Sequence, residues 1–229
     1  MPTRKEAAAI VRGTRDPSKA GWWRAAPAES LEEHIERLMD LESAAISIRS
    51  WQPLLVPGML QTYQYAASAI QATTPALPIE EVAERAELRQ RRIDSLSFGS
   101  DRRAWFIIDG SVLRREVGGA AVLLEQLEHL LNVASLRPSV TLQVVPEQTA
   151  MHPGLAGGYT MYRIGTQWVV FTESLSGSMI STRAEDIAVH AAAYDHLQAN
   201  ALSPAASLEA IDTARRELCL KVESALWCG

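Results

Sequence analysis

The sequence predicts an α+β fold: a helical N-terminal third, a small mixed sheet of about four strands, and a helical C-terminal tail. Apolar residues recur at helical spacing before residue 97 and after residue 181, as they do along one face of an amphipathic helix. Short segments rich in β-branched and aromatic residues lie between these regions, and such segments are typical of strands. Hydrophobic residues make up 47% of the 229-residue chain, which is enough to bury the core of one domain over residues 21–229.

The first predicted helix runs from Leu31 to Arg49. Ser30 can cap its N-terminus, with Glu33 three residues later as in a capping box. Apolar residues then recur at helical spacing through the segment. We expect Trp51 and Pro53 to end this helix. We also expect the indole of Trp51 to pack against other side chains.

A turn over residues 56–58, Val-Pro-Gly, separates this helix from the next. The residue before a proline is disfavoured in the α region, and glycine permits a tight turn. We therefore expect a fixed corner between two helices. Further helices are predicted over residues 59–72 and 79–96, again from the spacing of apolar residues.

One face of the third helix carries three arginines, Arg85, Arg89 and Arg92. Such a face is a candidate anion site. The alternative is an exposed helix laced with salt bridges, because Glu81 stands four residues before Arg85. We favour the alternative, since exposed ion pairs of this kind are common on helices.

Four segments in the centre of the chain predict strands. They are residues 103–109, 139–146, 157–164 and 167–173. Gly165-Thr166 joins the last two tightly, so we expect a hairpin there. A helix over residues 120–134 is predicted between the first two strands, from leucines at helical spacing. The tail contains two more helices, over residues 182–200 and 203–226.

Several common kinds of function lack support in the sequence. It contains no GxxxxGK[ST], GxGxxG, GxSxG or HExxH motif, so phosphate-loop, dinucleotide, serine-hydrolase and zincin chemistry lose their usual signatures. The five histidines and two cysteines have no metal-ligand spacing, and we predict neither a metal nor a cofactor. No segment is apolar enough to span a bilayer and no signal peptide is recognisable, so we expect a cytoplasmic protein.

The charge is unevenly distributed along the chain. The net charge is −5, but the first 24 residues hold six basic and two acidic side chains, a net charge of +4. We expect residues 1–20 to form a flexible basic leader. Twenty residues with one apolar cluster cannot form the packed helices of a helix-turn-helix unit, so we do not expect direct sequence-specific DNA binding.

Two carboxylates end predicted strands on faces that are otherwise apolar. Asp109 shares a face with Trp105, and Glu173 shares one with Phe171. A carboxylate at the rim of an apolar cavity has a raised pKa and can serve as an acid, a base or a hook for a cationic ligand. The alternative is that both residues end their strands in solvent or cap the turn that follows.

A third candidate, His152, lies on a glycine-rich loop just before a predicted strand. Loops of this type often close over ligands, although His152 can equally be an exposed loop residue. If the chain is an enzyme, Glu173, Asp109 and His152 are its candidate catalytic residues. The candidate ligand-binding residues are Trp105, Tyr159, Tyr162, Phe171 and Glu173.

A set of motifs runs in order over nearly the whole chain. The set comprises GWW (21–23), DLESAAISIRSWQPLLVPGMLQTYQYA (40–66), ELRQRRI (87–93), LRREVGG (113–119), QLEHLL (126–131), LQVVP (142–146), HPGLAGGY (152–159), VVFTE (169–173) and ALSPAAS (201–207). Together they resemble the C-terminal domain that follows the helix-turn-helix in many XRE-type regulators of streptomycetes and other actinobacteria. In that family the corner reads LVPGLLQT. Its first strand continues into an acidic pair, whereas this chain has Asp109-Gly110.

The resemblance implies the effector or partner-binding domain of a transcriptional regulator, and we expect a homodimer. Two hypotheses about function remain open. The first is a stand-alone sensory or interaction domain that binds a small molecule or a partner protein. The second is a small-molecule enzyme of secondary metabolism, of the cyclase, isomerase or dehydratase type, which would use an acid or base in its pocket.

Overall fold

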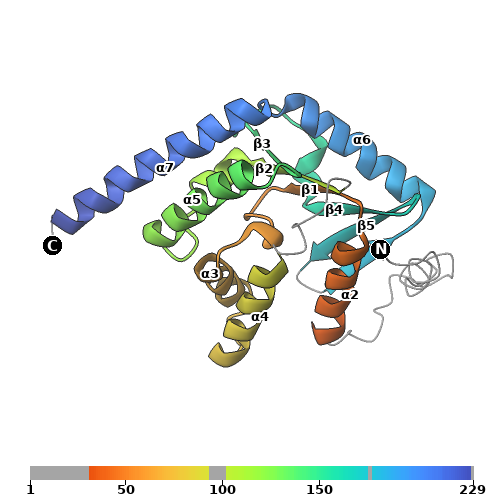
Figure 1. Cartoon of the computed structure of the whole chain (residues 1–229), viewed down its shortest axis with the longest axis horizontal. Coiled ribbons are helices and arrows are strands. Elements are labelled where there is room, and N and C mark those ends of the chain that lie inside the picture. Colours follow the sequence, from red (N-terminus) through yellow and green to blue (C-terminus); the bar gives the residue numbers. More distant parts are fainter. Residues whose placement is uncertain (1–30, 93–101, 175–176, 228–229) are drawn as a thin grey trace.

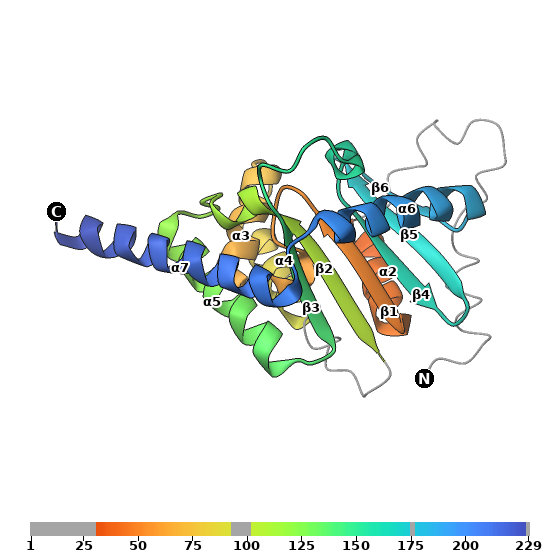
Figure 2. The same ribbon diagram turned by 90° about the horizontal axis from the view of Figure 1, so that it is seen from above.

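The computed structural model describes residues 31–92, 102–174 and 177–227, and it has the α+β fold that the sequence predicts. A mixed sheet crosses the molecule, with helices on both faces (Figures 1 and 2). The strands in the described ranges are β1 (Ser47–Gln52), β2 (Arg103–Asp109), β3 (Val140–Val145), β4 (Tyr159–Ile164), β5 (Gln167–Ser174) and β6 (Gly177–Ser181). The prediction of about four strands is wrong, because the sheet has six strands within the described ranges; β1 and β6 are not among the predicted segments.

The strand order is β3-β2-β1-β4-β5-β6. The first three strands are parallel, and β4, β5 and β6 follow as antiparallel neighbours. The predicted hairpin of β4 and β5 is confirmed; Gly165 in its turn has a φ of +61°, a conformation that favours glycine. The helices are α2 (Leu31–Ala44), α3 (Tyr63–Thr73), α4 (Ile79–Arg92), α5 (Ala120–Leu136), α6 (Ala184–Asn200) and α7 (Pro204–Trp227).

The two faces of the sheet bury different cores. On one face, residues of α2, α3, α5 and α7 enclose a broad core that contains Ile48, Phe106 and Tyr162. On the opposite face, α6 packs over a smaller core that contains Trp51 and Tyr159 (Figure 1). Side chains alternate along a strand, so consecutive residues of β1 belong to different faces.

The largest departure from the prediction is β1. The helix predicted over residues 31–49 ends at Ala44, and β1 follows it between β2 and β4. Ile46 and Ile48 are β-branched and fit a pleated surface better than a helix. Pairing on both edges satisfies the backbone hydrogen bonds of this segment. The predicted packing role of Trp51 is confirmed, because its side chain is fully buried.

The second predicted helix begins later than expected. A 3₁₀ turn, Gly58–Leu60, comes first. Thr62 then caps α3 by accepting a hydrogen bond from the amide of Tyr65 (3.3 Å). The third helix starts at Ile79 as predicted. Other predictions lie outside the described residues: the cap at Ser30, the leader over residues 1–20 and the end of the third helix at Leu96.

Hydrogen bonds hold the corner at residues 56–58. The side-chain amide of Gln61 donates to the carbonyl of Val56 (2.8 Å). From α5, the buried side chain of Gln126 donates to the carbonyl of Leu60 (2.7 Å). The corner is therefore fixed, as predicted, but it joins β1 to α3 rather than one helix to another.

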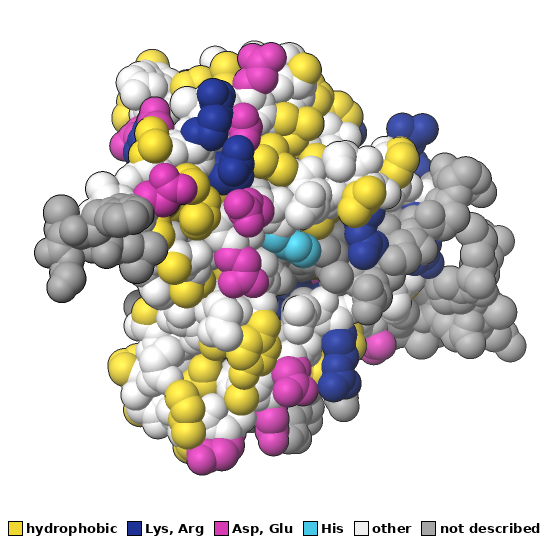
Figure 3. Space-filling model, turned by 60° about the vertical axis from the view of Figure 1, so that its left-hand side comes forward, with side chains coloured by type: hydrophobic (Ala, Val, Ile, Leu, Met, Phe, Trp, Pro, Cys, Tyr) yellow, Lys and Arg dark blue, Asp and Glu magenta, His cyan; other side chains and the backbone are white. Residues whose placement is uncertain are grey.

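Two features bear on membrane and nucleic-acid partners: the length of the helices and the charge on one face of the molecule. None of the described helices is long and apolar enough to cross a bilayer. On the face in Figure 3, acidic and basic side chains are interspersed among apolar ones. The described part of that face therefore has no basic stripe of the kind that follows a nucleic-acid backbone.

Candidate functional site

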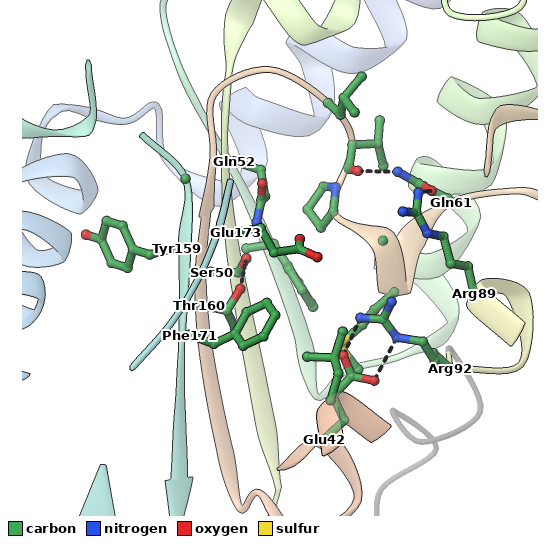
Figure 4. A pocket seen from close by; sticks show the side chains of 18 of the residues that line it. Glu42, Ser50, Gln52, Gln61, Arg89, Arg92, Tyr159, Thr160, Phe171 and Glu173 are labelled. Carbon is green, nitrogen blue, oxygen red and sulfur yellow. Dashed lines mark hydrogen bonds and ion pairs between the residues drawn. The ribbon is translucent and has the colours of Figure 1, made fainter. Parts of the chain in front are cut away.

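A pocket opens beside the corner, where the ends of β1, β4 and β5 face α2 and α4 (Figure 4). Its cavity volume is about 230 Å³, many times the roughly 10–15 Å³ that one water molecule needs. The pocket lies on the face of the sheet that carries the broad core. It is large enough for a small organic molecule, and its walls come from elements far apart in the sequence.

Apolar side chains form the floor of this pocket. Phe106 of β2 and Phe171 of β5 are buried there, together with Met59 of the 3₁₀ turn. Beside them, the hydroxyl groups of Ser50 and Thr160 hydrogen-bond to each other (2.9 Å). The floor therefore favours an apolar molecule, because its own polar groups are already paired.

A buried ion pair closes one end of the pocket. Glu42 of α2 and Arg92 of α4 have side chains that are 1% and 12% exposed, and the guanidinium donates to both carboxylate oxygens, with an Nε–Oε2 distance of 2.8 Å. Burial alone would lower the pKa of Arg92, but the charge and hydrogen bonds of Glu42 raise it above its ordinary value. Tyr162 also donates to Glu42 (3.5 Å). This pair is a structural clamp between α2 and α4.

Arg89, one turn earlier on α4, lines the same pocket but is bound to a neutral side chain rather than to a carboxylate. Its Nη1 donates to the side-chain oxygen of Gln61 (3.0 Å), and no described carboxylate lies within ion-pair distance. Burial, and then repulsion from Arg92, lower the pKa of Arg89 to about 10. The guanidinium remains charged at neutral pH, and no described carboxylate forms an ion pair with it.

Glu173 stands at the mouth of the pocket. It follows Phe171 at the end of β5, and its side chain is exposed. Figure 4 shows its carboxylate turned towards the wall that carries Arg89 and Arg92. The charge of Glu173 raises the pKa of both arginines, although burial and Arg92 together outweigh it at Arg89. Glu173 is therefore near enough to contact a ligand that fills the pocket.

The predicted ligand-binding residues divide between the two faces of the sheet. Tyr162, Phe171 and Glu173 line the pocket. Tyr159 also borders the pocket, but its side chain turns away from it (Figure 4), and its hydroxyl donates to the carbonyl of His190 on α6 (3.1 Å). Trp105 also belongs to the opposite face, where its Nε1 donates to a glutamine side chain of β3 (2.7 Å). Four of the five residues thus border the pocket, and Tyr159 does so without turning its side chain into it.

His152 lies on the opposite face as well. Its ring packs edge-on against Trp51, with 5.6 Å between the ring centroids. It is buried rather than an exposed loop residue, and its Nδ1 has no hydrogen-bond partner among the described residues. Glu173 is therefore the one candidate catalytic residue in the pocket, because Asp109 and His152 both lie elsewhere.

Asp109 acts as a cap. One carboxylate oxygen accepts hydrogen bonds from the amide (2.9 Å) and the hydroxyl (2.6 Å) of Ser111, at the start of the 3₁₀ helix Gly110–Leu113. The alternative reading of this residue, that it caps the following turn, is confirmed.

We expect Asp109→Ala to lower the free energy of unfolding by about 1 kcal/mol, the usual effect of losing a capping side chain. Urea unfolding measures this loss, and Asp109→Asn should recover most of it because asparagine also caps. Ligand capture should not change in either variant. Reduced capture at unchanged stability would contradict a purely capping role.

The pocket also contains residues that were not candidates. Glu42 and Gln61 contact arginines 50 and 28 positions away in the sequence, so no local pattern marks them. The sequence predicts that the arginine face of α4 is exposed and laced with salt bridges. The expected salt bridge is present at Arg85, which pairs with Glu81 (3.2 Å), although the Arg85 side chain is only 18% exposed. The expected exposure is wrong for Arg92, which is buried against α2.

Within the described ranges, no three His, Cys, Asp or Glu side chains are grouped closely enough to hold a metal ion.

Comparison with known proteins identifies the family. No curated protein matches the chain. A family model described as a domain of unknown function, DUF5753, matches residues 35–213, a span that includes every described residue of the pocket. The chain therefore belongs to the DUF5753 family.

Proposed function

We propose that this chain is a sensory domain that binds a small organic molecule, related to the C-terminal domains of XRE-type regulators. One observation carries the proposal: a cavity of about 230 Å³ in which an apolar floor meets Arg89, a charged side chain with no ion-pair partner among the described residues. Small-molecule sites typically combine apolar walls with a few convergent polar groups.

The construction of the walls supports a sensory role. The pocket is lined by α2, the corner, α4 and the sheet. The Glu42–Arg92 ion pair joins α2 to α4, the Gln61 hydrogen bonds join α4 to the corner, and the hydrogen bond from Tyr162 to Glu42 joins the sheet to α2. A molecule in the pocket would contact all of these elements at once. Its binding free energy would therefore stabilise one arrangement of the helices over the sheet. A partner protein that binds this arrangement would then respond to the ligand.

The test is native mass spectrometry of the purified chain after incubation with a metabolite extract of host cells. We expect a bound mass that persists unchanged, and the same spectra should show a dimer. A captured compound that disappears while a related mass accumulates would contradict the sensory proposal and favour the enzyme alternative. Failure to capture any compound would contradict both.

A blocking variant makes this test specific to the pocket. Gln52 lines the mouth, so Gln52→Trp should fill the entrance and reduce capture by at least about tenfold, since a bulky ring in a site excludes its occupant. Gln64→Trp is the matched control, because Gln64 is exposed on α3 and lies outside the lining. Equal loss in both variants would mean that binding occurs elsewhere.

A further inference from the structure

We infer that the pocket binds a small monocarboxylate, whose carboxylate pairs with Arg89 and whose apolar body lies on Phe106 and Phe171. The inference rests on the proposed function and names the chemical class of the molecule bound. Three observations support it: the guanidinium of Arg89 is held in position, the neighbouring arginines on α4 already have carboxylate partners, and the remaining lining combines an apolar floor with few charges.

The guanidinium of Arg89 is held in position by a chain of hydrogen bonds. The carbonyl of Val56 accepts from the side-chain amide of Gln61 (2.8 Å), and the oxygen of that same amide accepts from Arg89 (3.0 Å). Gln61 itself is buried. An arginine oriented in this way loses little conformational entropy when it binds an anion.

The neighbouring arginines on the same helix face each have a carboxylate partner. Arg85 pairs with Glu81 (3.2 Å), and Arg92 pairs with Glu42. Arg89 lies between them on this face, and its hydrogen-bond partner among the described residues is the neutral Gln61. A partly buried charge without a counter-charge is unfavourable for folding, so this position is better explained by a partner that arrives with the ligand.

The unused donors of Arg89 are accessible. A guanidinium has five N–H donors, of which one is bonded to Gln61. None of its nitrogens is among the buried polar atoms without a partner, and the residue lines the cavity. The remaining donors therefore reach the pocket, where two parallel hydrogen bonds to a carboxylate are the geometry that arginine favours.

The rest of the lining restricts the anion to a single charge. Glu173 stands at the mouth, and the charge of Arg92 is already paired with Glu42. A second negative charge on the ligand would therefore be repelled by Glu173 and would find no further unpaired cation among the described lining residues. The floor of the pocket is apolar. Inorganic phosphate and nucleotides therefore fit poorly, whereas an apolar acid satisfies Arg89 and covers the two phenyl rings.

The experiment is isothermal titration of the full chain with phenylacetate and with phenylacetamide, its neutral isostere. We expect phenylacetate to bind at millimolar concentration, and about tenfold more tightly than the amide, because a hydrogen bond to a charged group contributes more than a neutral one. An equal concentration of inorganic phosphate should not displace it.

Variants of α4 test whether Arg89 causes the preference for phenylacetate over phenylacetamide. Arg89→Met should abolish the difference between acid and amide while the amide still binds, and Arg89→Lys should retain part of it. Arg85→Met is the matched control, since Arg85 lies on the same face one turn earlier and does not line the pocket. The control should keep the full preference.

The outcomes separate this inference from the proposed function. Equal binding of acid and amide, displacement by phosphate, an unchanged preference in Arg89→Met, or no binding of phenylacetate at millimolar concentration would each overturn the monocarboxylate assignment. The proposed function would still stand if a compound were captured from the host extract. Failure of that capture would remove both.

Discussion

Replacing Arg92 by methionine is expected to lower the free energy of unfolding by about 3–5 kcal/mol, the usual cost of breaking a buried ion pair. The variant leaves Glu42, whose side chain is 1% exposed, with only the hydroxyl of Tyr162 as a hydrogen-bond donor among the described residues. An unpaired buried carboxylate is much less stable than a paired one. Urea unfolding followed by circular dichroism measures the change as a shift of the midpoint at constant m-value.

A double variant tests the cause of this loss. Glu42→Gln in the Arg92→Met background removes the unpaired charge, so it should restore part of the stability that the single variant loses. The coupling energy between the two positions is the difference between the stability loss of the double variant and the sum of the losses of the two single variants. No recovery in the double variant, or a loss below about 1 kcal/mol in Arg92→Met, would mean that the pair does not clamp α2 to α4.

Two other arginines of α4 serve as controls, because replacing either of them should not lower the free energy of unfolding in this way. Arg91 is exposed and its pair with Glu87 is long (3.5 Å), so Arg91→Met should change stability by less than about 0.5 kcal/mol. Arg89 has its pKa lowered to about 10 in the folded chain. At pH 7 its charged form is therefore less favourable folded than unfolded, and Arg89→Met should keep or slightly raise stability. A residue that weakens the fold and strengthens binding is characteristic of a functional site.

The fold class could be predicted from the sequence because most elements have strong local patterns. The leucines of α5 recur at helical spacing, and the β4–β5 hairpin has a glycine in its turn. The strand β1 could not be predicted in the same way. Its sequence, SIRSWQ, follows a helical pattern without a break, and the pairing with β2 and β4 that determines its conformation comes from residues more than fifty positions away.

The candidate site was predicted only in part, for a related reason. Alternation along β5 correctly placed Glu173 beside Phe171, and both line the pocket. The same rule placed Asp109 beside Trp105, but it does not say which face of the sheet each strand presents. The order of the strands puts those two residues on the side opposite the pocket. The partners of Arg89 and Arg92 come from other elements, so their chemistry depends on the tertiary structure.

Replacing Trp51 by alanine is expected to destabilise the chain by about 3–5 kcal/mol, as other large aromatic truncations in cores do. The side chain is fully buried in the smaller core, and its Nε1 donates to the carbonyl of Gly154 (2.9 Å). Trp168 is the control, because it belongs to the same face but is only partly buried. Trp168→Ala should therefore cost less, and equal losses would contradict this account of the core.

A milder variant, Trp51→Phe, tests whether the two faces of the sheet communicate. It keeps an aromatic ring in the core and loses the hydrogen bond to Gly154, so we expect a loss of about 1–3 kcal/mol. The residues on either side of it in β1, Ser50 and Gln52, line the pocket. If β1 is a rigid central strand, its backbone will not move and phenylacetate binding will be unchanged. Weaker binding at a temperature where the variant is fully folded would show that packing under α6 sets the shape of the pocket, and α6 would then be the element through which a partner detects the ligand.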